Sequence, residues 1–397
     1  MFVDQYLTLL VNKEQFTLKG VKLLNEKIKG VNNIGIIGFK YGSSGGGNIH
    51  FKNLIPYWEL LGVKVSIVEP IIGDGFTFLS VLKATIKTLF LKIDNFYDIS
   101  KCDIILSVSP YPMDFILSFL LSYKYNKPLA VYVHHITPSI LIHPYRRGLF
   151  RVFLNVFYIS GLITIFSRFK IPIFLDNPRT LNKKLMTVFP DFDAIPKNLE
   201  EDILVPKPAH MQYDICYIGR IENHKGVEDI IRVADILVKK YFMAPKIILA
   251  GKGKEKYVTK IKKKIDKMGL SKYIQLKGYV TERDKFVLLI NSKVFIFLSY
   301  EEGWSISVME AASVGTPIVA YSLPAYYYLK GNYFSVPVGD VMACAEKLNQ
   351  VINDYSLTKN IVAEAKECVD KFSYNFIAKQ QLTFFKKILK DFSTENL

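Results

Sequence analysis

Two cationic side chains fall at a point where a predicted strand gives way to a predicted helix. Arg220 and Lys225 lie in the loop between a strand over Asp214–Ile218 and a helix over Val227–Tyr241. Ligands of open α/β sheets bind at the carboxyl ends of the strands, and a helix N-terminus favours anions. An Arg and a Lys add fixed positive charge there. The pattern suits a diphosphate, and the alternative is two solvated surface cations.

Two glutamates form a second candidate set. Glu302 is expected in a loop, and Glu310 in the helix over Ser305–Val314 that follows it. The spacing of eight residues is a little more than two helical turns, so both carboxylates can face one ligand. Gly303 allows a close backbone approach, and carboxylates accept hydrogen bonds from sugar or ribose hydroxyls. Alternatively, Glu302 caps the helix and Glu310 pairs with a lysine.

These side chains need a framework, and the chain alternates short apolar runs with amphipathic stretches. That alternation is typical of α/β proteins with parallel sheets. A stretch rich in proline and acids over 191–210 is interpreted as a linker between two such halves. The two halves suggest two sheets that face each other across a cleft. In the first half we expect strands over 33–39, 63–68, 103–108, 129–133 and 171–175, and helices over 49–61, 114–123 and 149–165.

Two features of the first half are expected at the same edge of its sheet. Gly45, Gly46 and Gly47 fall in a loop after the first strand, where the backbone can approach a phosphate or sugar closely. On pattern alone, a glycine triplet is more often a flexible turn. His134 and His135 end a later strand, where a histidine could hydrogen-bond a sugar or assist proton movement. A purely structural histidine is the alternative.

With these motifs in place, the second half resembles the donor-binding domain of the retaining GT-B glycosyltransferases, in particular glycosyltransferase family 4. That family has a Gly-Arg…Lys-Gly loop, a Gly-x-Gly after the next strand, a pair of glutamates at this spacing, and Gly-x-Pro before a strand. The resemblance spans about residues 214–340. The matching residues are Gly219-Arg220 with Lys225-Gly226, Gly251-Lys252-Gly253, Glu302 with Glu310, and Gly315-Thr316-Pro317.

The resemblance implies a role for each matched residue. Arg220 and Lys225 would hold the donor diphosphate and stabilise the charge that builds on the leaving group. Glu302 would contact the transferred sugar, and Glu310 would bind ribose hydroxyls. The expected catalytic residues are therefore Arg220, Lys225, Glu302 and His134. Gly45, Gly46 and Gly47 would form an acceptor or phosphate loop. The other expected donor contacts are Gly251, Tyr279 and Val280 (their backbone near the base), Gly303, Trp304, Ser305 and Ile306.

One departure from the family pattern stands beside the expected sugar pocket. Trp304-Ser305 occupies the place where many members have Phe-Pro or Phe-Gly, so the resemblance does not fix the donor. The fold class that it implies is α/β, of the GT-B type, with two Rossmann-like domains facing a central cleft. We expect an acceptor-binding domain over residues 1–200, a nucleotide-sugar donor-binding domain over residues 201–375, and a helix over 376–397 that packs back toward the first domain.

The charge of the chain indicates an anionic partner. The formal net charge is +16. The 61 residues between Asp114 and Asp176 contain no acid and seven lysines or arginines. Basic side chains beside the apolar helix expected over 149–165 are typical of an interfacial membrane element, so Arg146, Arg147 and Arg151 are the predicted membrane and acceptor face. The alternative is a buried helix with ordinary surface cations.

We therefore expect a retaining, metal-independent hexosyltransferase that uses a UDP- or GDP-sugar and a lipid-linked or glycan acceptor. No cofactor is expected besides the nucleotide-sugar. The expected place is the cytoplasmic face of the cell membrane, because four scattered cysteines fit a reducing compartment and no run reaches a membrane span of about 20 apolar residues. The alternatives are a sugar-nucleotide epimerase and a non-catalytic nucleic-acid-binding protein, the latter suggested by the charge and the lysine-rich run over 252–267.

Overall fold

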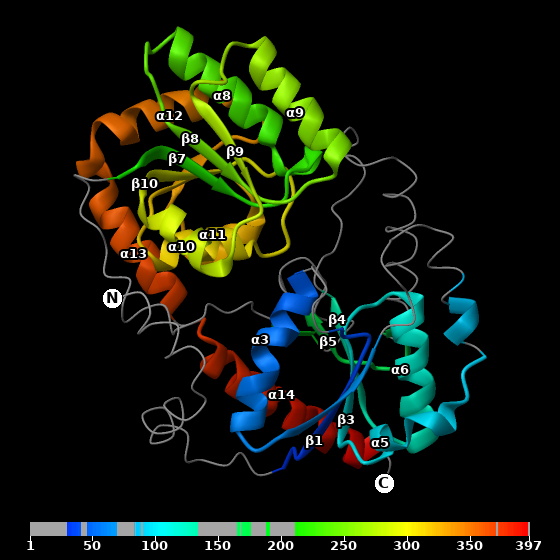
Figure 1. The fold of residues 1–397 in the computed structure, drawn as a ribbon. Helices are drawn as coiled ribbons and strands as arrows, with labels where there is room; N and C mark the ends of the chain where they lie inside the picture. Colours follow the sequence, from blue (N-terminus) through cyan, green and yellow to red (C-terminus); the bar gives the residue numbers. More distant parts are fainter. Residues whose placement is uncertain are drawn as a thin grey trace, which may run out of the picture.

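Two six-stranded sheets form the framework, one in each half of the molecule (Figure 1). Every strand pair in them is parallel. Because parallel neighbours need a crossover, helices connect the strands and cover the sheets. The computed structural model describes residues 30–40, 46–69, 83, 85–88, 90–133, 165–166, 168–175, 188–190, 211–370 and 372–395.

The first sheet has the strand order β2-β1-β3-β4-β5-β6. Its side chains alternate between two cores, as the period of two in a strand requires. Ile34 and Ile36 of β1 pack in the core that includes α3, whereas Ile37 packs in the core that includes α6. The strands are β1 (Asn33–Ile37), β2 (Lys64–Val68), β3 (Ile104–Ser107), β4 (Leu129–Val133), β5 (Ile173–Leu175) and β6 (Val188–Pro190). The helices are α3 (Gly46–Leu60), η2 (Ile93–Phe96), α5 (Tyr97–Ser100) and α6 (Pro112–Tyr125).

The second sheet has the order β12-β11-β10-β7-β8-β9. From β7 the chain proceeds outward through β8 and β9, then returns to pair β10 with the other side of β7 and continues to β12. This is the doubly wound order whose reversal point lies between β7 and β10. The strands are β7 (Tyr213–Ile218), β8 (Ile247–Ala250), β9 (Ile274–Gly278), β10 (Ser292–Phe297), β11 (Ile318–Tyr321) and β12 (Phe334–Val336).

Helices pack around this sheet on amphipathic faces. In α8, for example, Ile230, Ile231 and Leu237 are buried, and the helix packs against α12. The helices are η6 (Asn223–Lys225), α8 (Val227–Lys239), α9 (Glu255–Lys267), α10 (Glu282–Ile290), α11 (Ile306–Ser313), η7 (Pro324–Leu329), α12 (Val341–Asn353), η8 (Tyr355–Thr358) and α13 (Lys359–Asp370).

The helix α14 (Tyr374–Glu395) leaves the second half and packs against α3 of the first half (Figure 1). Phe385 meets the buried ring of Trp58 edge to face, with ring centroids 5.7 Å apart. The hydroxyl of Tyr374 accepts a hydrogen bond of 2.8 Å from Asn53 Nδ2, and its ring stacks on Tyr57. Aromatic burial of this kind contributes strongly to packing, so α14 belongs to the core of the first half.

Some expected elements differ from the structure. Gly46 and Gly47 lie in the first turn of α3, not in a loop, so the helix begins earlier than its apolar pattern predicts. The short strands β6 and β12 were not predicted. The expected helix over 149–165, except for its end, and the linker over 191–210 lie outside the described residues. Within the described residues, no helix has the length and apolar character needed to span a membrane.

Candidate active site

The candidate site lies at the reversal point of the second sheet. The strands β7 and β10 pair directly, with Phe295 opposite Cys216. The loops that follow these two strands carry Lys225 and Glu302. The amide of Tyr300 donates a hydrogen bond of 2.9 Å to the carbonyl of His224, which ties the two loops together. Residues 77 positions apart in sequence are thereby brought within reach of each other.

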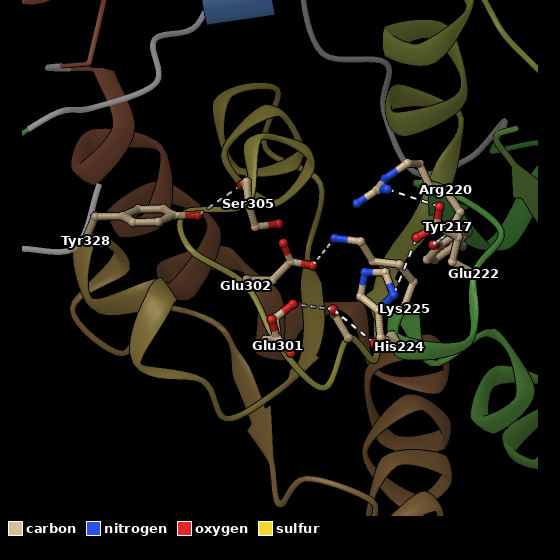
Figure 2. A network of polar contacts seen from close by, with 10 residues as sticks. Tyr217, Arg220, Glu222, His224, Lys225, Glu301, Glu302, Ser305 and Tyr328 are labelled. Carbon is tan, nitrogen blue, oxygen red and sulfur yellow. Dashed lines mark hydrogen bonds and ion pairs between the residues drawn. The ribbon is translucent and has the colours of Figure 1, made fainter. Parts of the chain in front are cut away.

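An ion pair joins the two loops (Figure 2). Lys225 Nζ donates to Glu302 Oε1 at 2.6 Å, and the two side chains are only 12% and 9% exposed. The ammonium also lies 5.8 Å from the centroid of the Phe297 ring. A buried charge needs a partner, because desolvation of a lone ion is costly. Each of these charges therefore holds the other until a ligand supplies a better partner.

Two glycines allow close contacts between backbone segments in these loops. Gly226 has φ +70° and directly precedes α8, and a Cβ there would overlap the carbonyl of Leu298. Gly251 has φ +149°, and a Cβ there would overlap the carbonyl of Gly219. Only glycine fits such positions without strain. The two sequence motifs that contain these glycines thus serve loop packing at the carboxyl ends of β7 and β8.

Arg220 extends beside the pair and is 63% exposed (Figure 2). Its guanidinium donates to Glu222 Oε1 at 3.0 Å. Its carbonyl accepts a hydrogen bond of 2.8 Å from the Tyr217 hydroxyl. Burial raises the pKa of Tyr217, and the charge of Glu302 raises it further, so this phenol stays protonated as a donor. The loop backbone is therefore anchored while the guanidinium remains accessible.

Glu310 is buried on α11 and bound by a lysine that the sequence reasoning did not single out. Lys285 Nζ of α10 lies 2.5 Å from Glu310 Oε1 and 2.7 Å from Glu282 Oε2. Burial lowers the pKa of Lys285, but the charges of Glu310 and Glu282 outweigh it, so the pKa is raised overall. The structure thus has the lysine pairing that was the alternative for Glu310. Since no motif marks Lys285, only the packing of α10 on α11 reveals it.

The aromatic residue at the start of α11 points into the protein. Trp304 is buried among aromatic rings, with centroids 4.5 Å from Tyr328 and 5.4 Å from Phe372. Its indole Nε1 donates to the sulfur of Met309. The departure at Trp304, expected beside the sugar pocket, therefore has a packing role for its side chain. Gly303 is half-buried, and Ser305 and Ile306 form the N-cap and first residue of α11.

Tyr279 and Val280 follow β9 at the same edge of the sheet. The ring of Tyr279 is 66% exposed, and Lys252 Nζ lies 4.4 Å from its centroid. Lys252 comes from the loop after β8, between Gly251 and Gly253. A cation over an aromatic face is attracted by the ring quadrupole. The expected base-binding segment therefore presents an aromatic ring already held by a cation.

The residues predicted from the first half are described only in part. His134, His135, Gly45, Arg146, Arg147 and Arg151 lie outside the described residues. The same sheet edge does contain a buried carboxyl group, Asp114 in the first turn of α6, which sequence reasoning did not select. It accepts a hydrogen bond of 2.5 Å from Ser109 Oγ. Burial raises the pKa of Asp114 to about 7, although the bond from Ser109 opposes the shift.

A further buried carboxylate, that of Asp229, is hydrogen-bonded to the loop that carries Glu302. Asp229 of α8 is fully buried and accepts hydrogen bonds from the hydroxyls of Tyr300 and Tyr321. Arg232 approaches its other oxygen at 3.4 Å. Tyr300 stands in the loop that carries Glu302, so Asp229 links that loop to α8. Among the described residues, no group of three or more His, Cys, Asp or Glu could hold a metal ion.

Comparison with known proteins shows which family and which solved structures this chain is similar to. Residues 200–368 match the family model of "Glycosyl transferases group 1", and this segment contains all four motifs found in the sequence. The whole chain is similar to the crystal structure of HepE from Anabaena, in complex with UDP and glucose, with a TM-score of 0.66 over 90% of this chain and 100% of that one. At 15% identity this likeness shows the fold, which is GT-B. Residues 200–368 are thus similar to the group 1 glycosyltransferases, and the fold is that of the GT-B structures.

Two curated relatives match part of this chain in sequence. The poly(ribitol-phosphate) α-N-acetylglucosaminyltransferase of Staphylococcus aureus is 29% identical over 185 residues, which are 45% of this chain and 36% of that protein. The N,N'-diacetylbacillosaminyl-diphospho-undecaprenol α-1,3-N-acetylgalactosaminyltransferase of Campylobacter jejuni is 23% identical over 180 residues, 45% of each chain. The chain thus spans about a third to a half of the length of these relatives.

Proposed function

We propose that this protein is a glycosyltransferase that moves a hexosyl unit from a UDP- or GDP-sugar to a lipid-linked or glycan acceptor. The observation that carries the proposal is the buried Lys225–Glu302 pair at the reversal point of the second sheet. It offers a cation to an anionic ligand and a carboxylate to a hydroxylated one. The likeness to a protein crystallised with UDP and glucose supports the same ligand class.

The proposed chemistry starts from an exchange of partners. A bound diphosphate attracts Lys225 away from Glu302, and Arg220 adds a bidentate contact from the same loop. As the glycosyl bond breaks, negative charge grows on the departing diphosphate, and these fixed cations stabilise it. Glu302, released from Lys225, accepts a hydrogen bond from the transferred sugar. The carboxylate of Glu310 accepts hydrogen bonds from the ribose hydroxyls while it also contacts Lys285.

Two finer parts of the proposal concern stereochemistry and metal. We propose transfer with retention of configuration, as the family resemblance implies, and without a divalent cation, because Arg220 and Lys225 supply positive charge. An NMR assay of the product's anomeric proton tests the first part, with inversion as the opposing outcome. Transfer rates that survive EDTA support the second, whereas a loss that Mg²⁺ or Mn²⁺ restores refutes it.

We further propose that the acceptor lies at the cytoplasmic membrane face. The support is the basic stretch with Arg146, Arg147 and Arg151, together with the undecaprenol-linked substrate in the name of the Campylobacter jejuni relative. Each basic residue near an anionic surface adds about 1 kcal/mol of binding. Replacing the three arginines with glutamate should abolish sedimentation with anionic liposomes, and unchanged sedimentation would refute this part.

The donor class is testable by thermal unfolding in the presence of UDP, GDP, ADP and their sugar conjugates. A ligand at 100 times its Kd stabilises the folded protein by about 2.7 kcal/mol. One nucleotide should stabilise the wild type but not Arg220→Ala/Lys225→Ala. The matched control is Lys239→Ala, whose cation is 67% exposed at the far end of α8. If no nucleotide stabilises the wild type, the proposal fails, and a gel shift with nucleic acid becomes the next test.

A further inference from the structure

Ser305 has an unusual backbone for its residue type. It lies between the Glu302 loop and α11 with φ +68° and ψ +83°, in the left-handed region. Glycine reaches this region without cost, whereas a residue with a Cβ is strained there. The left-handed bend alone would therefore favour glycine. The presence of a serine, and not a glycine, at this strained position therefore needs a separate explanation.

The hydroxyl of Ser305 has no hydrogen-bond partner. The residue is 9% exposed, and its Oγ is buried without a bonded donor or acceptor. A serine at an N-cap ordinarily accepts a hydrogen bond from an amide in the first helical turn, but the side chain of Ser305 does not cap α11. Buried hydroxyls are nearly always hydrogen-bonded, so an exception demands explanation.

The surroundings of Ser305 are those of the candidate site. Ser305 follows Glu302 by three residues, and both belong to the group of polar residues drawn in Figure 2. The Tyr328 hydroxyl donates to the Ser305 carbonyl at 3.3 Å, which fixes the backbone and leaves the side-chain hydroxyl unused. A second buried hydroxyl without a partner, that of Tyr326, lies within electrostatic range of Glu302. Two buried hydroxyls without a partner thus belong to residues near Glu302, whose carboxylate pairs with Lys225.

We propose that Ser305 Oγ hydrogen-bonds a hydroxyl of the transferred sugar and, with Glu302, determines which sugar is accepted. This inference rests on the proposed function and deepens it. The neighbouring carboxylate selects the ligand group, because Glu302 repels a phosphate oxygen but accepts a bond from a hydroxyl. A sugar hydroxyl can donate to Glu302 while it accepts from Ser305. Neither a phosphate nor an apolar group satisfies both partners.

The test uses Ser305→Gly, which removes the hydroxyl and relieves the backbone strain, so it should fold at least as stably as the wild type. The donor probe is whichever of UDP-glucose, UDP-N-acetylglucosamine and GDP-mannose stabilises the wild type most. Calorimetry should give a Kd for that sugar nucleotide about 5- to 10-fold higher in the variant, with the Kd for the free nucleoside diphosphate unchanged within about twofold. Ser313→Ala, which removes a buried hydroxyl at the other end of α11, is the matched control.

Monodeoxy analogues of the same sugar nucleotide identify the partner hydroxyl. One analogue should bind the wild type more weakly than the parent sugar and bind Ser305→Gly as well as the parent does. The inference is overturned if Ser305→Gly binds the sugar nucleotide like the wild type, if it weakens the free diphosphate equally, or if every analogue loses the same factor. Failure of the wild type to bind any donor would instead refute the proposed function beneath it.

Discussion

Asp114 in the first half and Glu302 in the second are carboxyl groups with different kinds of partner. At the carboxyl edge of the first sheet, Asp114 is held by the neutral hydroxyl of Ser109, and its pKa is raised to about 7. At the corresponding edge of the second sheet, Glu302 and Glu310 are each held by a lysine ammonium. These groups therefore differ in the charge of the partner that each one receives.

This contrast separates two uses of a carboxyl group. An acid bound by a neutral donor keeps its proton up to near-neutral pH and contributes to packing without a net charge. A carboxylate bound by lysine keeps its charge, and the lysine can be transferred to an anionic ligand. We infer that the second half is built to exchange ionic partners, whereas Asp114 supports the fold of the first half.

The largest expected effect follows from Glu302→Gln. This variant retains the shape of the side chain but removes its charge, so it should lower the transfer rate about 100- to 1,000-fold. It should also lower the thermal stability, because the buried ammonium of Lys225 loses its charged partner. Asp114→Asn, the matching change in the first half, should alter the rate by no more than about threefold. Transfer rates of the two purified variants test this difference. Equal losses of rate would contradict a catalytic role for Glu302 and a structural role for Asp114.

The glycines sharpen the comparison through stability. Gly226→Ala would force a Cβ into the Leu298 carbonyl, so we expect a loss of about 3 kcal/mol in the free energy of unfolding. Gly38→Ala, beside Asp114, should cost less, because its Cβ would meet side-chain atoms that can shift. Gly62 has φ +85° with open space around it, so Gly62→Ala isolates the backbone strain at about 1 kcal/mol. Urea denaturation should give this order, and a reversed order would contradict it.

The pH dependence of Asp114 gives the third prediction. Its pKa is about 7 in the folded protein and 3.8 ordinarily, so the folded state binds the proton more tightly. The stability that Asp114 contributes is complete below pH 3.8 and is lost as the pH rises to about 7. Relative to Asp114→Asn, the wild type should lose about 3–4 kcal/mol of unfolding free energy between pH 4 and pH 7.5. A difference that stays constant with pH would show that the carboxyl is ionised throughout.

Glu228 in the second half should show the smallest effect, with the opposite sign. Burial opposes the shift, but Lys264 and Lys260 lower the pKa of Glu228 to about 2. Its contribution is present above pH 4.5 and is lost as the pH falls toward 2. Compared with Glu228→Gln, the wild type should lose about 0.5 kcal/mol over that range, since the lysines are partly solvated. The loss should vanish in 1 M NaCl, and a salt-independent loss would exclude the ion pairs as its cause.

Much of the fold could be predicted from sequence, because buried parallel strands are continuous apolar runs. The strand predicted over 129–133 matches β4 residue for residue, and the strand predicted over Asp214–Ile218 differs from β7 by one residue at its start. The strand β12 was not predicted, because its pairing with β11, and not a local pattern, defines it. The start of α3 at Gly46 was missed since glycine is a poor helix former.

The candidate site was predictable where a motif fixes the spacing and not where packing supplies the partner. The motifs bring Lys225 and Glu302 to neighbouring loops, but only the reversal of strand order between β7 and β10 makes them touch. Lys285 and Asp229 carry no motif, and each finds its partner across a helix or sheet contact. Trp304 shows the converse, because a residue inside a motif turned out to face the core.

The contact between α14 and α3 also sets an order of events during synthesis. Asn53 and Tyr374, which hydrogen-bond, are separated by 321 residues. A ribosome that adds about 5–20 residues per second needs roughly 15–60 s to cover that distance. Throughout this interval the apolar face of α3 around Trp58 lacks its cover, so the nascent first half presents a hydrophobic surface to chaperones. Folding of the first half is therefore completed only after translation has passed through the second half.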